Sequence, residues 1–303
     1  MPQHIDMPVQ MDINQLLVYK LISSQFPQWA NLAIRPVETS GWDNRTFHLG
    51  DDMLVRLPSA AHYAGQVEKE QEWLPKLAPF LPNKIPVPLG IGEPGENYPW
   101  KWSVYRWIEG KTVASSPEID LCVLAKDLAN FLTSLQAVDS KGGPVAGPQN
   151  FYRGGPVNVY DSETRQAIRI LSDEMNSDLV TKIWEIGISQ TWSKDPVWVH
   201  GDISAGNLLI NQNRLDAVID FGQLCIGDPS CDLVIAWTLF DAESRQVFHD
   251  ALLPDPGTWA RARSWALWKA LIVILNASQT NIVEAKQAHR TFDNILAEYV
   301  LSH

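Results

Sequence analysis

Residues 199–222 contain two short apolar runs on either side of a polar turn, and this arrangement limits what the chain can form. The first run is 208–210, the turn is 211–214, and the second run extends over 215–219. Apolar runs of this length on either side of a polar turn predict a β-hairpin. We therefore expect two antiparallel strands here, with the polar residues Asn207 and Asp220 at their open end.

Polar side chains at the open end of this hairpin suit a metal site. If Ile210 pairs with Leu215, strand alternation places Asn207 and Asp220 on one face, diagonally about 7 Å apart. One amide and one carboxylate are a sufficient protein contribution for Mg²⁺, which keeps waters and phosphate oxygens as its other ligands. Asp202, in the preceding loop, suits a group that accepts a proton from an attacking hydroxyl or orients that hydroxyl.

The spacing of these residues indicates a functional motif more strongly than any single residue does, since each alone could be a cap or a turn residue. His200-Gly201-Asp202 precedes Asn207, and Asp220-Phe221-Gly222 begins thirteen positions after Asn207. This is the spacing of the kinase catalytic loop and metal motif, with Gly201 where protein kinases have arginine. We interpret His200 as a residue that braces the loop by hydrogen bonding.

The first third of the chain predicts an antiparallel sheet with one helix on it. After an opening helix over 13–24, extended segments are expected at 32–39, 45–49, 53–57, 85–91 and 102–108. Residues 66–77 have apolar side chains at helical spacing, and Glu70 falls on the same stripe. A carboxylate on a buried stripe needs a partner, so we expect Glu70 to be paired.

Beyond Gly110 the pattern becomes helical, which makes the fold class α+β. Ser115-Ser116-Pro117-Glu118 predicts a helix start with a capping box, and the helix should run to about Val138. Further expected elements are a short strand at 196–200 and helices near 162–174, 178–191, 258–276 and 281–301.

These motifs resemble the aminoglycoside phosphotransferase family and its macrolide phosphotransferase, choline kinase and homoserine kinase relatives. The resemblance also covers Gly41 to Asn44, Leu54 to Pro58, Val67 to Glu70, Val104 to Trp107, Gly227 to Pro229, and Asp232-Leu233. It implies a bilobal protein-kinase-like fold. Residues 1–108 would form a nucleotide-binding N-lobe with an antiparallel sheet, and residues 109–303 a mostly helical C-lobe with the catalytic loop, metal site and acceptor site.

The resemblance also implies roles for individual residues. Asp202 is the catalytic carboxylate, and Asn207 and Asp220 hold Mg²⁺ against the phosphates of ATP or GTP. Arg56 takes the position of the N-lobe lysine that grips the α and β phosphates, and Glu70 that of its carboxylate partner. Guanidinium binds phosphate bidentately, but its reach differs from that of an ammonium group.

Further nucleotide contacts are expected from a loop and a hinge. A loop that resembles the phosphate-covering loop, with one glycine in place of three, would supply Ser40, Gly41 and Asn44. The hinge whose backbone binds the base edge would supply Tyr105, Trp107 and Ile108, and a buried aromatic strand is the alternative.

Two acidic residues follow the metal motif. The resemblance suggests that Asp228 supports the loop or borders the acceptor site. For Asp232 we favour a helix N-terminal carboxylate, stabilised by the helix dipole.

Composition limits the classes of binding partner and the cellular location that we expect. The net charge of −11 is opposite to that of a phosphate-backbone binder, so nucleic acid is excluded, and it fits either an acidic surface or a cleft for a cationic ligand. The three cysteines without a CxxC pair indicate reduced thiols in the cytoplasm. The first residues lack signal-peptide character, and the apolar run at 265–275 is too short for a membrane span.

The predicted function is transfer of the γ-phosphoryl group of ATP or GTP to a hydroxyl of a small molecule. The candidates are an aminoglycoside, which would imply antibiotic resistance, or another cationic alcohol. A nucleotide-binding pseudokinase with a regulatory role is the alternative. A metal hydrolase that uses His200 and Asp202 is a third hypothesis, and it requires more ligands nearby than the sequence offers. The sequence predicts no particular oligomeric state.

Overall fold

The computed structural model describes residues 12–37, 43–276 and 282–302, and the chain forms two compact units. The first unit comprises Met1–Pro79, Lys84–Gly110 and Ala217–Gly222. The second comprises Phe80–Asn83, Lys111–Asp216 and Gln223–His303. The segment that carries Asp220 therefore belongs to the first unit, although it lies late in the sequence.

The first unit contains the predicted antiparallel sheet. Its strand order is β1-β2-β3-β5-β4, and each strand is antiparallel to its neighbours. The strands are β1 (Ile34–Pro36), β2 (Asn44–Leu49), β3 (Met53–Pro58), β4 (Pro88–Gly92) and β5 (Trp102–Arg106). The predicted antiparallel sheet is confirmed, and its first three strands follow one another along the chain. The predicted last strand is too long, since β5 ends at Arg106 and not at Ile108.

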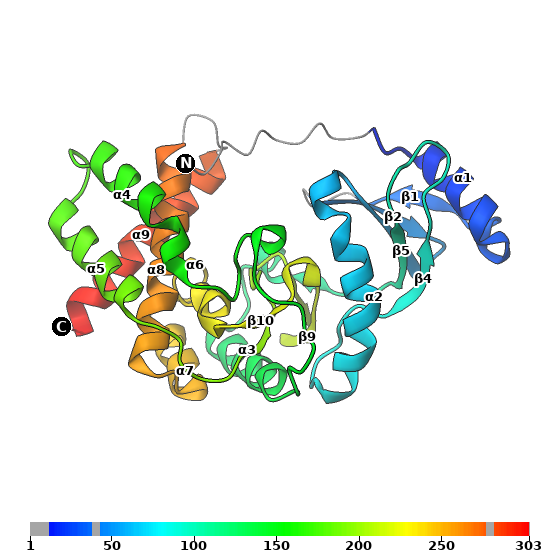
Figure 1. Cartoon of the computed structure of the whole chain (residues 1–303). Coiled ribbons are helices and arrows are strands. Elements are labelled where there is room, and N and C mark those ends of the chain that lie inside the picture. The colour runs from blue at the N-terminus through cyan, green and yellow to red at the C-terminus, as the bar shows by residue number, and fades with distance from the viewer. Residues whose placement is uncertain (1–11, 38–42, 277–281, 303) are drawn as a thin grey trace. The chain divides into compact units, whose positions relative to one another are not determined.

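Two helices pack on this sheet. Helix α1 (Gln15–Gln25) is capped by Asn14, whose side chain accepts from the Leu17 N–H, and it buries Leu21 and Ile22 in a core with Trp102 of β5. Helix α2 (Gly65–Leu77) lies along a face of the sheet near β4 and β5 (Figure 1). Glu70 on α2 is only 3% exposed, which confirms its predicted place on the buried stripe.

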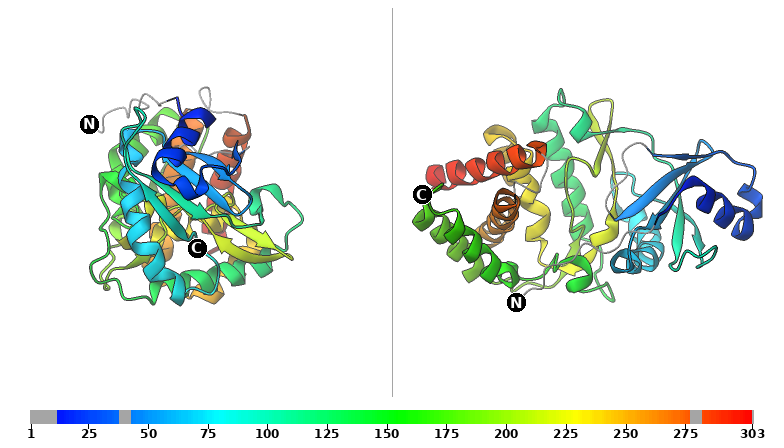
Figure 2. Two further views of the ribbon diagram at one scale, coloured as in Figure 1. Left: turned by 90° about the vertical axis from the view of Figure 1, so that its right-hand side faces the viewer. Right: turned by 90° about the horizontal axis from the view of Figure 1, so that it is seen from above.

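The second unit is mainly helical. Its helices are α3 (Leu121–Gln136), α4 (Asp161–Ile170), α5 (Ser177–Ser189), α6 (Ile235–Thr238), α7 (Ala242–Leu252), α8 (Pro256–Leu275) and α9 (Ile282–Ser302). Helix α8 packs against α4, α5 and α9, and Figure 2 shows these helices side by side. Because α8 has neighbours on several sides, it is buried along most of its length, including Arg261 and Arg263.

The predicted helix start at Ser115 is wrong. Residues Val113–Ser115 form a short 3₁₀ turn capped by Thr112, and α3 begins only at Leu121. The Asp120 carboxylate accepts two backbone N–H groups there, from Cys122 at 2.9 Å and Val123 at 3.1 Å. An aspartate that satisfies two N–H groups is a stronger start signal than the proposed Ser115 capping box.

Short strands lie within and beside residues 199–222, the segment that carries the predicted motifs. Strand β7 (Val197–Val199) pairs with β10 (Cys225–Gly227), and β6 (Lys111–Thr112), β8 (Leu208–Asn211) and β9 (Arg214–Val218) form a sheet in the order β6-β8-β9. Between β8 and β9, Gln212 and Asn213 have φ angles of 50° and 59°. Two successive positive φ angles are typical of a tight hairpin turn, so the predicted hairpin is confirmed.

None of the helices in the described ranges combines the length and apolar character that crossing a membrane requires. Cys122, Cys225 and Cys231 are all free thiols.

Candidate active site

The loop over residues 200–207, which the sequence predicts to be the catalytic loop, begins at the end of β7, and a buried carboxylate holds it in place. The Asp232 side chain accepts the backbone N–H of His200 at 2.8 Å and that of Gly201 at 2.7 Å. Asp232 is fully buried and lies in a 3₁₀ helix over Pro229–Val234. Asp232 lies in the first turn of this helix, as predicted, and its carboxylate additionally accepts two N–H groups some thirty residues earlier in the chain.

Gly201 is required by the loop's conformation. Its φ is 85°, and a Cβ at this position would lie 2.7 Å from the Gln223 carbonyl oxygen. A side chain would be strained and would also collide with backbone. The glycine that replaces the arginine of protein kinases thus fits a close contact between the loop and the segment after the metal motif.

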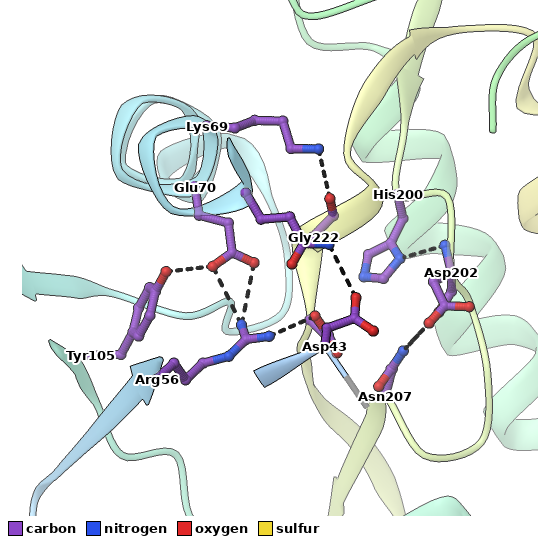
Figure 3. Close-up of polar contacts among 11 residues, drawn as sticks. Asp43, Arg56, Lys69, Glu70, Tyr105, His200, Asp202, Asn207 and Gly222 are labelled. Carbon is purple, nitrogen blue, oxygen red and sulfur yellow. Dashed lines mark hydrogen bonds and ion pairs between the residues drawn. The ribbon is translucent and has the colours of Figure 1, made fainter. Parts of the chain in front are cut away.

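His200 and Asn207 shape the surroundings of Asp202. The fully buried His200 ring accepts the Asp202 N–H at Nδ1, at 3.1 Å. The Asn207 Nδ2 donates to the Asp202 carbonyl at 2.9 Å and to its carboxylate at 3.0 Å, as Figure 3 shows. These bonds engage the amide nitrogen of Asn207, so its Oδ1 is the atom suited to bind a cation, while the Asp202 side chain stays exposed.

The Asp232 carboxyl gives a pH test of this arrangement. Burial raises the pKa of Asp232 from 3.8 to about 7, although the N–H groups of Gly201 and His200 oppose that rise. Between about pH 4 and pH 7 the folded state then holds a proton that the unfolded state has lost. The free energy of unfolding should fall as pH rises through this range, by at most about 1.4 kcal/mol per pH unit.

The measurement is urea unfolding of the wild type and of Asp232→Asn at pH 4.5, 6 and 8. We expect the wild type to lose stability relative to the variant as pH rises to about 7, and no further change above it. Parallel pH profiles of the two proteins would contradict the assignment.

Arg56 forms the centre of the charged cluster in the first unit. Its guanidinium lies 3.3 Å from both Glu70 oxygens and 2.8 Å from an Asp220 oxygen. Burial lowers the pKa of Arg56, but Glu70 and Asp220 raise it above its ordinary value, so the group keeps its charge. The predicted pairing of Arg56 with Glu70 is confirmed, and the contact with Asp220 adds a second carboxylate.

Asp220 reaches Arg56 by a backbone turn and not by strand alternation. Strand β9 ends at Val218, and Asp220 has a φ of 65°. The period-two argument that placed Asp220 on the face of Asn207 is therefore wrong, because it extends a strand through a left-handed residue. Asn207 belongs to the second unit and Asp220 to the first.

Two further side chains complete the cluster, and Figure 3 shows both near α2. The Tyr105 hydroxyl donates to the Glu70 carboxylate, and Lys69 Nζ donates to the Gly222 carbonyl at 2.6 Å. Sequence reasoning did not identify Lys69, although it lies within the Val67 to Glu70 segment. Helix α2 thus supplies Glu70 to Arg56 and Lys69 to the end of the metal motif.

The residues predicted to contact the nucleotide base and phosphates occupy different settings. Tyr105 is buried within β5. The backbone N–H of Trp107 donates to the Asp52 carbonyl at 2.8 Å. Ile108 lies just beyond the strand. Asn44 begins β2, is buried and pairs with Pro58. The predicted loop residues Ser40 and Gly41 lie outside the described residues.

Asp228 is held by a buried guanidinium. Arg261 of α8 contacts both carboxylate oxygens, at 2.6 and 3.2 Å, and Asp228 also caps the backbone N–H of Ser230 at 3.1 Å. Both side chains are nearly inaccessible to solvent. This geometry favours the supporting role of Asp228 over a border of the acceptor site.

A family model matches the sequence over most of the chain. The model described as the phosphotransferase enzyme family covers residues 33–265, and the chain belongs to that family.

Curated relatives match shorter stretches. Hygromycin-B 4-O-kinase of Escherichia coli is 25% identical over 164 residues, which cover 49% of this chain and 46% of the relative. Aminoglycoside 3'-phosphotransferase of Escherichia coli is 38% identical over 66 residues, which cover 22% of this chain and 24% of the relative. The chain thus spans less than half the length of these relatives.

Solved structures show the fold over nearly the whole chain. The GDP complex of wild-type aminoglycoside 2'-phosphotransferase-IIIa matches with a TM-score of 0.72 at 20% identity, covering 95% of this chain and all of that one. A macrolide 2'-phosphotransferase from Brachybacterium faecium matches with a TM-score of 0.58 at 20% identity, covering 91% and 97%. The predicted α+β, kinase-like two-lobe fold is confirmed.

Proposed function

We propose that this protein transfers the γ-phosphoryl group of ATP or GTP to a hydroxyl of a small molecule. The observation that carries the proposal is the exposed Asp202 carboxylate on a loop held by His200, Asn207 and Asp232. The acceptor oxygen attacks the γ phosphorus, and the bond to the β–γ bridging oxygen breaks. Asp202 takes the hydroxyl proton, and the nucleoside diphosphate leaves.

Asn207 and Asp220 are the proposed ligands of Mg²⁺. The donor set of one amide oxygen and one carboxylate suits this ion, which takes water and phosphate oxygens as its remaining ligands. When bound, the ion would neutralise charge on the nucleotide phosphates. Arg56, charged and anchored by Glu70, is the proposed phosphate-binding cation.

The remaining nucleotide contacts stay predictions of the same proposal. Residues 1–108 would bind the nucleotide, with Ser40, Gly41 and Asn44 near the phosphates and Tyr105, Trp107 and Ile108 near the base. Because the Trp107 N–H is engaged by Asp52, the backbone at Ile108 is the better candidate for contact with the base. Residues 109–303 would bind the acceptor. Free thiols support a cytoplasmic location.

Two other functions are less well supported. A pseudokinase would bind nucleotide without needing Asp202, yet the structure holds this carboxylate in an ordered and exposed position. A metal hydrolase needs several ligands, and within the described part of the chain no three His, Cys, Asp or Glu side chains gather as a metal-binding group. The names of the relatives keep an aminoglycoside, and with it a role in antibiotic resistance, as one candidate acceptor.

Binding of Mg²⁺ with ATP or GTP tests the proposal. At about 100 times Kd, the nucleotide should add about 2.7 kcal/mol to the free energy of unfolding, measured by thermal shift. An enzyme should also give an acceptor heavier by one phosphoryl group, detected by mass spectrometry. Stabilisation without any product across hydroxylated compounds would favour the pseudokinase, and the absence of stabilisation by either nucleotide would contradict both.

A further inference from the structure

The turn that carries Asp220 is attached to the rest of the first unit on both sides of that residue. Before it, the Val218 N–H donates to the Lys84 carbonyl at 3.0 Å. After it, Lys69 Nζ donates to the Gly222 carbonyl at 2.6 Å, as Figure 3 shows. The backbone around Asp220 is therefore held from two directions by groups that lie elsewhere in the sequence.

Asp220 needs such support because of its own backbone conformation. Its φ of 65° lies in the left-handed region, which residues other than glycine adopt at a cost in free energy. Residues in this region persist where the surrounding contacts over-determine the backbone. The bond from Lys69 fixes the carbonyl two residues after Asp220, so it limits the directions that the Asp220 carboxylate can take.

The contact between Lys69 and Gly222 is close and is supported by packing. An ammonium group makes a charge-assisted bond to a carbonyl, which is stronger than a bond between neutral groups. Gly222 is buried, and a Cβ there would lie 2.8 Å from the Gln66 side chain. Gln66 is itself held, since its Nε2 donates to Asp43 at 3.0 Å. Helix α2 thus contacts Gly222 through two side chains one helical turn apart, Gln66 and Lys69.

The next residue of the same helix acts on the Asp220 side chain. Glu70 binds Arg56, and the Arg56 guanidinium lies 2.8 Å from an Asp220 oxygen. In the proposed function Arg56 binds phosphate and Asp220 binds Mg²⁺, so this ion pair is exchanged for those ligands. The bond from Lys69 involves neither group, so it can hold the turn with and without nucleotide.

We propose that Lys69 is a positioning residue that aims the Asp220 carboxylate at the metal ion. The inference rests on the proposed function and assigns a role to a side chain outside the metal motif itself. Lys69 acts through the backbone, because its Nζ binds the Gly222 carbonyl and needs no contact with nucleotide or metal. Its loss should therefore weaken metal binding and leave the binding of metal-free nucleotide unchanged.

Mn²⁺, followed by electron paramagnetic resonance, is the probe for Mg²⁺ in the test. It is titrated into the full chain saturated with the β,γ-imido analogue of ATP or GTP, for the wild type and for Lys69→Met. We expect the variant to raise Kd for Mn²⁺ about tenfold, the low end of the range for loss of a residue that orients a metal ligand. Kd for the analogue in EDTA, measured by calorimetry, should stay within about twofold of the wild type.

Two matched variants complete the design. Lys69→Arg keeps a charged donor for the carbonyl and should restore most of the affinity for Mn²⁺. Lys76 lies on the same helix, with a side chain that is 53% exposed and paired with Glu72, and Lys76→Met should leave both constants unchanged. If Lys69→Met is unfolded at the temperature of the titration, Lys69→Gln replaces it, because glutamine is too short to reach the Gly222 carbonyl.

An unchanged Kd for Mn²⁺ in the folded variant would overturn the inference. An equal loss of affinity for the metal-free analogue would also overturn it, because Lys69 would then bind phosphate directly. If the wild type binds the analogue and forms phosphorylated product while Lys69→Met matches it in both constants, the proposed function stands and the inference fails. If the wild type binds neither Mn²⁺ nor either analogue, the proposed function fails, and the inference fails with it.

Discussion

Replacement of Asp202 by asparagine is expected to lower kcat for phosphoryl transfer by about 10²- to 10⁴-fold, the range for loss of a general base. Asp202 is exposed on the loop, so an acceptor hydroxyl can approach its carboxylate and transfer a proton to it. Asparagine has nearly the same shape and retains the backbone N–H that donates to His200. The fold should therefore persist, and the measurement is kcat with saturating nucleotide and acceptor.

The matched control is Asp195→Asn. Asp195 is also an exposed aspartate, in the segment just before β7, and it should leave kcat within about twofold of the wild type. A folded Asp202→Asn protein that keeps more than about a tenth of wild-type kcat would rule out Asp202 as the catalytic carboxylate.

Replacement of Glu70 by glutamine is expected to lower the free energy of unfolding by about 3 kcal/mol, the low end of the range for breaking a buried ion pair. The Glu70 side chain is only 4% exposed and that of Arg56 only 14%. Glutamine removes the charge that faces Arg56 and one acceptor for the Tyr105 hydroxyl. Asp220 stays in contact with Arg56, which limits the loss. Urea unfolding of the variant and of the wild type measures this loss in the free energy of unfolding.

The same helix offers the control. Glu68→Gln breaks an ion pair with Lys101 in which the Glu68 side chain is 63% exposed, so the expected loss is below about 1 kcal/mol. Equal losses in the two variants would show that burial of Glu70 contributes nothing to the stability of this unit. We also expect Glu70→Gln to weaken nucleotide binding, because Arg56 loses the group that anchors it.

Local features of the fold were predictable from the sequence. The hairpin of β8 and β9 follows from two apolar runs and a polar turn in which Asn213 tolerates a positive φ. The buried place of Glu70 follows from helical periodicity, and a buried carboxylate implies a cation such as Arg56. These features depend on residues close together in the chain, so their pattern carries the information.

Other features depended on tertiary contacts. The start of α3 was mispredicted because Ser115 and Asp120 both resemble caps, and only the folded backbone shows which of them accepts N–H groups. Lys69 was missed because its partner, the Gly222 carbonyl, lies 153 residues away and has no side-chain signature. A backbone carbonyl can accept a hydrogen bond from any donor side chain, so no residue pattern predicts this partner of Lys69.

The spacing of Asp202, Asn207 and Asp220, which is that of the kinase catalytic loop and metal motif, was evident from the sequence alone, because spacing depends only on the order of the residues. The tertiary structure decided that Asp232 supports the catalytic loop and that Asp220 turns towards Arg56. The physical reason is that a buried charge must find a partner, and which group lies within hydrogen-bond distance depends on packing between segments far apart in the chain.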